Sequence, residues 1–303
     1  MAELATTPGT VPAPLAERPA ARRGSNVLGI ILGNKVGVIG FLMLFGFVLL
    51  AIFGPMLVKA DTSTHVSDIY LAPSLQHPFG TDYAGRDVLR QVVRGGRSIM
   101  VVGVLAAIIT TGIAVSFGAL AAYLGGWVDS LILGISDVVL TIPYLVLLGV
   151  LAAFVKLSSP LLLALIIGGV AWPTLLRAVR AQVLSLKERE YVEAARMLDL
   201  GTTHILFREV LPNMMSYIVI NFVIAMTGAI YGQILLYFLG LVPLTGDNWG
   251  LMINLAYTRG AMFFTNSLWY ILAPIVAISL LQLSLVMITQ SLEDIFNPRL
   301  REG

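Results

Sequence analysis

Residues 98–128 read SIMVVGVLAAIITTGIAVSFGALAAYLGGWV, a run without Asp, Glu, Lys or Arg that is bounded by Arg97 and Asp129. A helix needs roughly 20 apolar residues to cross about 30 Å of bilayer hydrocarbon, because each residue advances it by about 1.5 Å. The run is therefore long enough to span a membrane. Because the bilayer core offers no water to the backbone, such a span must be a helix, which satisfies its own hydrogen bonds.

Five further stretches of the chain have the same character. They occupy 36–58, 130–155, 157–176, part of 210–246 and part of 260–292, and the second of these five is interrupted by Asp137. The first is too long for the apolar region of a cleaved signal peptide, so we interpret it as an anchor. We predict an all-α integral membrane protein with six transmembrane helices.

The composition supports this class. The chain has 303 residues, of which 57% are hydrophobic and 12% are charged, and its mean hydropathy is +0.88. Soluble proteins carry about 25% charged residues. The net charge of +2 is too small to indicate a nucleic-acid partner. Disulfides and thiolate metal sites are excluded because the chain has no cysteine, and His65, His77 and His204 lack metal-ligand spacing.

Catalytic sequence motifs are missing. The chain contains no G-x-x-x-x-G-K-S/T loop for ATP phosphates, no H-E-x-x-H metal motif and no G-x-S-x-G elbow. We therefore predict no catalytic residues, no metal site and no ATP-binding site in this chain, which is not expected to be an enzyme by itself.

Charge and composition divide the chain into five segments. We predict a disordered cytoplasmic tail (1–26), an N-terminal transmembrane helix (27–60), an extracytoplasmic segment (61–97), a five-helix core (98–292) and a cytoplasmic tail (293–303). Arginines near the N-terminus favour a cytoplasmic location for it, and six spans return the C-terminus to the same side. Four arginines between 86 and 97 oppose this topology, and we interpret that part as an interfacial amphipathic helix.

The polar stretch 187–212 is the most informative segment between spans. Helix formers at 190–200 are followed by Gly201, which we predict to stop the helix in the left-handed conformation. Ala194 and Ala195 are small enough to allow close approach of another protein, and Glu193 and Arg196 flank them. The residues alone leave two interpretations open, a docking knob or an ordinary loop.

The order Glu193-Ala194-Ala195, a spacer and Leu211-Pro212 resembles the EAA motif of ABC importer permeases. In that family the segment is a coupling helix that fits a cleft on a cytoplasmic ATPase. The family usually has glycine where this chain has Asp199. The resemblance implies that 187–212 is a coupling loop whose contact residues are Glu193, Ala194, Ala195, Arg196, Asp199, Gly201, Leu211 and Pro212.

Further blocks are similar to the C-type permease subunit of dipeptide and oligopeptide importers. They are HPFGTDYAGRDVL at 77–89, GGR at 95–97, ISDVVLTIP at 135–143, WG at 249–250 and SLEDIFNPR at 291–299. The resemblance implies the type I ABC importer transmembrane-domain fold, a bacterial cytoplasmic membrane location and a di- or oligopeptide substrate. It also implies a homologous permease subunit, two cytoplasmic ATPase subunits that bind ATP and Mg, and an extracytoplasmic substrate-binding protein. No cofactor is expected in this chain.

Two other transport functions remain alternatives. Similar importers carry nickel chelates or another small solute. An ion-coupled secondary transporter would use charges inside the membrane and an internal repeat. Asp137 is one such charge, although a structural hydrogen bond is the other interpretation of it, and no clear repeat is present.

Polar residues in or beside the later spans are candidates for two further surfaces. Tyr231, Gln233 and Gln282 are interpreted either as lining for the translocation pathway or as hydrogen bonds between helices. Asp247, Asn248 and Trp249 lie between the fifth and sixth spans. The family resemblance implies that they contact the binding protein, whereas Trp249 by itself suits an anchor at the water–lipid interface.

Overall fold

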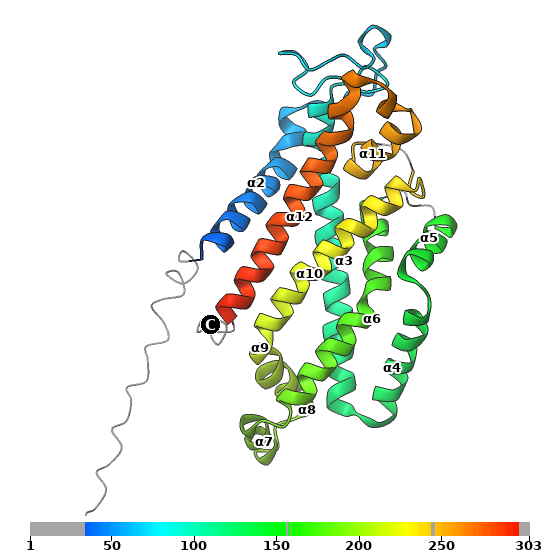
Figure 1. Cartoon of the computed structure of the whole chain (residues 1–303). Coiled ribbons are helices and arrows are strands. Elements are labelled where there is room, and N and C mark those ends of the chain that lie inside the picture. Colours follow the sequence, from blue (N-terminus) through cyan, green and yellow to red (C-terminus); the bar gives the residue numbers. More distant parts are fainter. Residues whose placement is uncertain (1–33, 156, 158, 244–245, 297–303) are drawn as a thin grey trace, which may run out of the picture.

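The computed structural model describes residues 34–155, 157, 159–243 and 246–296, and all its regular elements are helical (Figure 1). Within these residues five helices are long and apolar enough to cross a membrane, or six if one bent pair counts as a span. The five are α2 (Lys35–Leu57), α3 (Val88–Leu124), α6 (Pro160–Leu186), α10 (Met215–Phe238) and α12 (Leu268–Phe296). The all-α membrane fold is thus confirmed, while the predicted tail 1–26 lies outside the described residues.

The predicted third span, 130–155, is not one straight helix. It consists of α4 (Gly126–Thr141) and α5 (Tyr144–Phe154), whose axes differ by 86°. Ile142 between them has an extended backbone (φ −90°, ψ 126°). Pro143 explains the break, because proline has no N–H for the helix and disfavours the helical conformation of the preceding residue.

The second predicted span begins earlier than residue 98. Helix α3 starts at Val88, so the arginine-rich part is the first turns of the span and not a separate interfacial helix. Val88 is fully buried, and the Asp87 carboxylate accepts a hydrogen bond from the Arg90 N–H at 2.9 Å. This cap and the buried apolar residues of its first turns extend the helix N-terminally.

Other helix starts also follow local sequence signals. The Asn34 side chain accepts from Gly37 N–H at the start of α2, and Ser159 accepts from Leu162 N–H at the start of α6. Pro160 occupies the first turn of α6, where the missing N–H costs nothing. Helix α6 continues through the polar residues to Leu186, ten residues beyond the apolar run that ends at Leu176.

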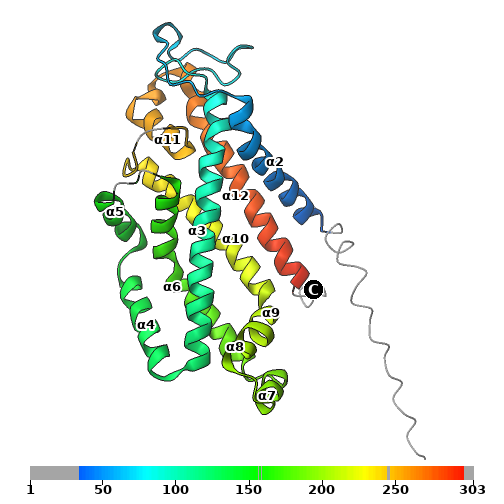
Figure 2. The same ribbon diagram turned by 180° about the vertical axis from the view of Figure 1, so that it is seen from behind.

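Helix α3 runs through the centre of the bundle and packs along α6 (Figures 1 and 2). Small residues permit this approach. A Cβ on Gly118 would lie 2.8 Å from the Leu176 carbonyl oxygen, and one on Gly168 would lie 2.7 Å from that of Ala106. The Thr110 hydroxyl donates to the Gly168 carbonyl at 3.3 Å. Close contact through small residues is a usual means of helix association in membranes.

Short elements cover the two opposite ends of the bundle (Figure 1). One end carries the irregular segment 58–87 with a 3₁₀ turn (Val66–Asp68), α11 (Trp249–Thr258) and two further 3₁₀ turns (Ala261–Phe263 and Thr265–Ser267). The other end carries α7 (Glu190–Met197), α8 (Thr202–His204), a π-helix (Ile205–Val210) and α9 (Leu211–Asn213). The coupling loop and the 58–87 segment are therefore far apart.

We expect Gly168→Ala to lower the free energy of unfolding by about 1–3 kcal/mol, because the new methyl would overlap the backbone of α3. Gly169→Ala is the matched control, since a Cβ there meets no atom of this chain within 4 Å apart from its own helix backbone. Alanine is favoured over glycine in helices by about 1 kcal/mol, so the control should be neutral or stabilising. Thermal unfolding of the purified protein in detergent measures both. Equal effects would show that Gly168 does not set the α3–α6 distance.

Candidate functional site

The turn after α7 is formed by Asp199, not by Gly201 as the sequence predicted. Asp199 has φ +55°, whereas Gly201 has an extended backbone (φ −61°, ψ 156°). The Leu200 N–H donates to the Ala195 carbonyl at 3.2 Å, and the Asp199 N–H donates to the Arg196 carbonyl at 3.0 Å. This pair of bonds around a left-handed residue is a Schellman motif. Asp199 thus occupies the position where glycine is most easily accommodated.

The two alanines of the coupling loop face opposite ways. Ala195 is buried and packs with Val192, Ile205 and Leu206 in an apolar cluster that also contains Val179 of α6. Ala194 and Glu193 are exposed. The expectation that both alanines permit close approach of a partner is therefore wrong for Ala195, whose small size serves the packing of α7 on its own chain.

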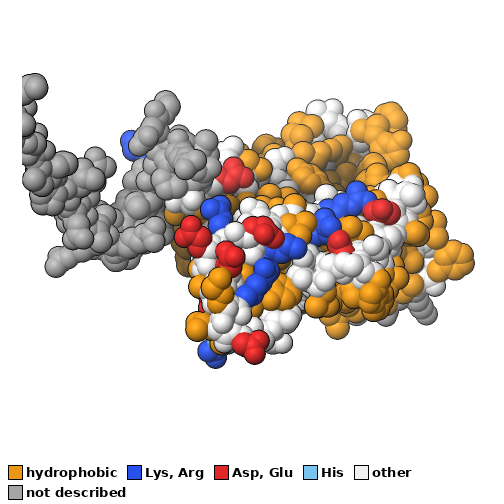
Figure 3. Space-filling view, turned by 90° about the horizontal axis from the view of Figure 1, so that it is seen from below, with side chains coloured by type: hydrophobic (Ala, Val, Ile, Leu, Met, Phe, Trp, Pro, Cys, Tyr) orange, Lys and Arg blue, Asp and Glu red, His pale blue; other side chains and the backbone are white. Residues whose placement is uncertain are grey.

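The outer tip of α7 presents two apolar side chains that the sequence analysis did not single out. Met197 is 81% exposed and Leu198 is 74% exposed, next to Glu193 and Ala194. Seen from this end, charged side chains of both signs gather over the surface, with hydrophobic side chains among and around them (Figure 3). The sequence did contain a hint of this apolar tip, because Met197 and Leu198 stand directly before Asp199 in an otherwise charged segment.

Other members of the predicted coupling set hold the loop in place. The Arg196 guanidinium lies 5.9 Å from the centroid of the Tyr123 ring at the end of α3, a cation–π contact. Leu211 is half-buried against the same apolar cluster, while Pro212 is exposed in the first turn of α9. Tyr191 of α7, which is not in the predicted set, is partly buried beside these residues. Burial raises the pKa of its phenol, and its hydroxyl has no hydrogen-bond partner among the described residues.

At the opposite end, Trp249 and Asn248 are internal residues. The Trp249 indole N–H donates to the Val92 carbonyl at 2.8 Å, and its ring lies where a Cβ on Gly95 would be only 2.8 Å away. The side-chain oxygen of Asn248, Oδ1, caps α11 by accepting from the Gly250 N–H at 2.8 Å. Both side chains are almost fully buried. They join α11 to α3, so Trp249 is no interfacial anchor and neither residue can touch a partner in this conformation.

Asp247 keeps partial exposure but is engaged in an ion pair. Its carboxylate accepts from the Arg94 Nε at 2.5 Å, and the same guanidinium donates to the Val58 carbonyl at 2.9 Å. Arg94 therefore connects the end of α2, the start of α3 and Asp247, two residues before α11.

Two of the three candidate pathway residues act between helices. The Gln233 amide donates to the Ile99 carbonyl at 2.8 Å, which joins α10 to α3. The Gln282 amide donates to the Thr227 carbonyl at 3.4 Å, which joins α12 to α10. Both are buried, so the geometry favours the helix–helix interpretation for them. Tyr231, in contrast, is 55% exposed on α10.

Two ion pairs attach α4 to α6. Arg180 donates to the two oxygens of Asp129 at 2.6 and 2.5 Å, and Arg177 pairs with Asp137 two turns further along α4. The Asp137 charge is thus neutralised by a neighbouring helix, which agrees with its interpretation as a structural hydrogen-bonding residue. Both side chains of the Asp137–Arg177 pair are about half exposed on this chain.

Comparison with known proteins decides the family. Residues 114–302 match the family described as "Binding-protein-dependent transport system inner membrane component", and residues 27–78 match the "N-terminal TM domain of oligopeptide transport permease C". The first match covers more than half of the chain and includes the whole coupling loop. The chain belongs to this family of permeases.

Similar proteins have recorded names of the same kind. The dipeptide transport system permease protein DppC of Bacillus subtilis is 34% identical over 275 residues, which cover 88% of this chain and 83% of that protein. The oligopeptide transport system permease protein OppC of Bacillus subtilis is 31% identical over 272 residues, which cover 89% of this chain and 87% of that protein. The dipeptide transport system permease protein DppC of Alkalihalophilus pseudofirmus is 32% identical over 273 residues, which cover 88% of this chain and 87% of that protein.

Family membership makes the chain a multi-pass membrane permease of ABC transport that depends on a binding protein and on ATPase subunits. The permease is not itself catalytic, and its family works without a cofactor. Within the described residues, no group of three or more His, Cys, Asp or Glu side chains could hold a metal ion.

The left-handed backbone at Asp199 leads to a prediction for this permease. We expect Asp199→Val to lower the free energy of unfolding by about 1–2 kcal/mol and Asp199→Gly to keep or raise it, because only glycine adopts this conformation without strain. Arg189→Val is the control, since Arg189 has an extended backbone (φ −83°, ψ 145°) that suits valine. Thermal unfolding of the purified permease measures the differences. If Asp199→Gly lowered the free energy of unfolding as much as Asp199→Val, the Asp199 side chain and not its backbone conformation would be responsible for the stability of this turn.

Proposed function

We propose that the permease is one of two homologous transmembrane subunits of an ATP-driven importer for di- or oligopeptides. Two cytoplasmic ATPase subunits dock at the α7 end of the complex, and an extracytoplasmic binding protein delivers peptide at the opposite end. The peptide assignment rests on the recorded names of relatives that are 31–34% identical over most of the chain. The observation that carries the coupling role is the exposed tip of α7 on a rigidly packed base.

The base of α7 connects the tip to the spanning helices. Val192 and Ala195 pack in one apolar cluster with Val179 and Val183 of α6 and with Ala119 of α3. Side chains in such a cluster are close-packed and transmit displacement. A movement of the tip by a partner is thus carried into α3 and α6. ATP binding in the partner subunits draws the coupling loops together and opens the pathway outward.

The tip has the composition of a docking contact. Met197 and Leu198 supply apolar area, Ala194 allows close approach, and Glu193 supplies orientation through charge. A fully buried apolar contact surrounded by polar residues is the usual arrangement of an energetically important interface. Because the ATPases are cytoplasmic, docking here places both termini of the chain in the cytoplasm.

The 58–87 segment then faces the binding protein. Trp249 and Asn248 are buried beneath this end, so the contact uses exposed side chains such as Leu75 and Phe263 instead. Asp247 remains available at the edge of the same surface.

The pathway lies along the face formed by α4, α6 and α10. A half-exposed Asp137–Arg177 pair within the spanning region is too costly to place against hydrocarbon, so this face meets water or the second permease subunit. Beside it is a hollow of about 240 Å³ whose lining includes Tyr144, Thr174 and Asn221. We assign these polar side chains, with the exposed Tyr231, to the pathway in place of Gln233 and Gln282.

Docking at the tip predicts that Leu198→Asp and Glu193→Lys reduce co-purification of the ATPase subunits at least about tenfold. An unpaired carboxylate buried in the contact costs well over the 1.4 kcal/mol that a tenfold change requires, to order of magnitude. Leu75→Asp, at the opposite end, is the control and should leave ATPase binding unchanged. Ala195→Trp is unsuitable as a docking test because it disrupts packing inside the permease. Stoichiometric ATPase and full transport in both tip variants would contradict the coupling role.

Peptide import is tested with the assembled complex in proteoliposomes. We expect ATP-dependent accumulation of labelled di- or oligopeptides only when the binding protein is added, because delivery precedes translocation. Liposomes with binding protein but a permease carrying Leu198→Asp serve as the uncoupled control. Normal peptide uptake by a cell that lacks this permease and other peptide importers would argue against the peptide assignment while leaving the docking result intact.

A further inference from the structure

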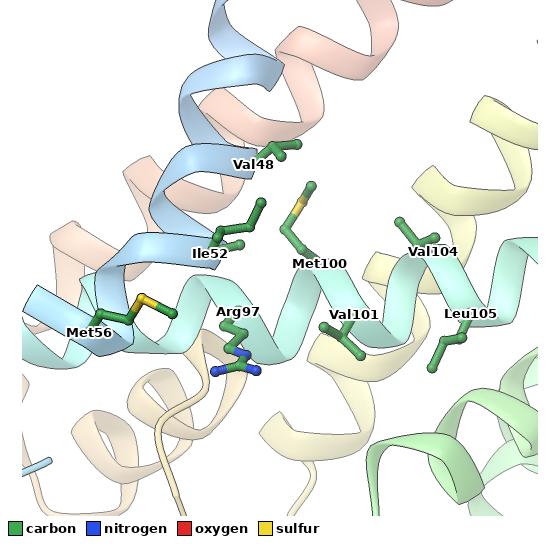
Figure 4. A pocket seen from close by; sticks show the side chains of 9 residues that line it. Val48, Ile52, Met56, Arg97, Met100, Val101, Val104 and Leu105 are labelled. Carbon is green, nitrogen blue, oxygen red and sulfur yellow. The ribbon is translucent and has the colours of Figure 1, made fainter.

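An apolar groove separates α2 from α3 on the surface of the bundle (Figure 4). It has a volume of about 500 Å³. Helix α2 contributes Val48, Ile52 and Met56 to its walls, and α3 contributes Met100, Val104 and Leu105. One charged residue, Arg97 of α3, also lines it.

The groove arises from the way α2 crosses α3. The two helices approach closely at Gly54, where a Cβ would lie 2.8 Å from a Val93 side-chain carbon. Further along, α2 follows α12 instead, with Gly37 against Ser291 and Gly40 against Met287. The space between α2 and α3 therefore widens away from the crossing (Figure 2).

In the part of the chain that the structure describes, Arg97 and Arg90 have no anionic partner, unlike the other two arginines between 86 and 97, and of these two only Arg97 lines the groove. Arg86 pairs with Asp82 at 2.8 Å, and Arg94 pairs with Asp247 at 2.5 Å. Among the described residues, the Arg97 guanidinium forms no ion pair and no side-chain hydrogen bond, and it is exposed. Its charge is thus available to an anion from outside the chain.

A polar hollow adjoins the groove at Arg97. It has a volume of about 360 Å³, and its lining includes Arg94, Arg97, Ser98 and Asp247. Arg97 and Val101 line both spaces. A long apolar groove and a polar compartment with excess positive charge therefore meet at one guanidinium.

The position along the helix matches a membrane interface. Arg97 is the last charged residue before the uncharged run 98–128. From Arg97 to Leu105 the groove extends about 12 Å along α3, close to the thickness of hydrocarbon in one leaflet, about 15 Å. Large side chains on α2, such as Phe41 and Leu42, are exposed on this chain, as expected of a helix that faces lipid.

We propose that this groove binds one anionic phospholipid, with an acyl chain between α2 and α3 and the phosphate on Arg97. The headgroup occupies the polar hollow beside Ser98. The bound lipid supports α2, which contacts the rest of the bundle over a small part of its surface.

The test uses the intact importer with its ATPase subunits in nanodiscs of equal parts phosphatidylglycerol and phosphatidylcholine. After extraction into mild detergent, mass spectrometry measures the lipid retained. We expect phosphatidylglycerol to be enriched about fivefold over phosphatidylcholine on the wild-type complex, and Arg97→Gln to remove that preference, since one arginine near an anionic headgroup contributes about that much. Arg90→Gln, an exposed arginine on the same helix outside the groove, should behave as the wild type.

A second variant tests the contribution of the apolar groove separately from that of the Arg97 charge. Val101→Trp fills the groove and leaves Arg97 in place, so retention of phosphatidylglycerol should fall at least about fivefold if the acyl chain occupies that space. Co-purification of the ATPases verifies that each variant is assembled. Equal retention by wild type, Arg97→Gln and Val101→Trp would overturn the proposal. So would efficient cross-linking of Ile52→Cys, in this cysteine-free chain, to the second permease subunit, because the groove would then be a subunit interface.

Discussion

The close approach of neighbouring helices to α3 is the contact on which the rest of the bundle depends. Residues of α3 enter all three apolar clusters of the described chain, from Val88 at one end to Ala122 at the other. Glycine on either side of the contacts lets backbones meet, as at Gly118 and Gly168. In a bilayer the surrounding lipid is as apolar as the helix surfaces, so packing of this kind, with a few hydrogen bonds, must hold the helices together.

This arrangement gives the proposed coupling loop a packed base on α3 and α6. The buried face of α7 and the ends of α3 and α6 form one cluster, while the exposed tip points away from the bundle. Within the Glu-Ala-Ala motif the second alanine therefore serves the permease itself, and the glutamate and first alanine serve the proposed partner. A change at Ala195 and a change at Leu198 act through different contacts, even though the residues are neighbours in the chain.

Polar residues in the spanning helices fall into two groups by their neighbours. Gln233 and Gln282 satisfy carbonyl groups of adjacent helices and are buried. Asp137 and Arg177 satisfy each other but remain half-exposed on this chain, which supports the proposed pathway face. Arg97 also lacks an anionic partner within the described residues, and unlike the equally unpaired Arg90 it lines the groove between α2 and α3.

The sequence by itself determined the membrane class, the approximate position of the spanning segments and the presence of a distinct polar segment at 187–212. These features depend on local hydrophobic length and on motifs, which neighbouring helices do not alter. The sequence also contained Pro143, which accounts for a break after α4, but it did not specify the 86° angle between α4 and α5. Only the tertiary structure decided that Asp199 turns the chain, that Trp249 is buried against Gly95 and that Ala195 faces inward. Each of these outcomes depends on atoms distant in the chain or on a backbone angle, and a one-dimensional pattern of residue types does not specify which side of a short helix will be covered.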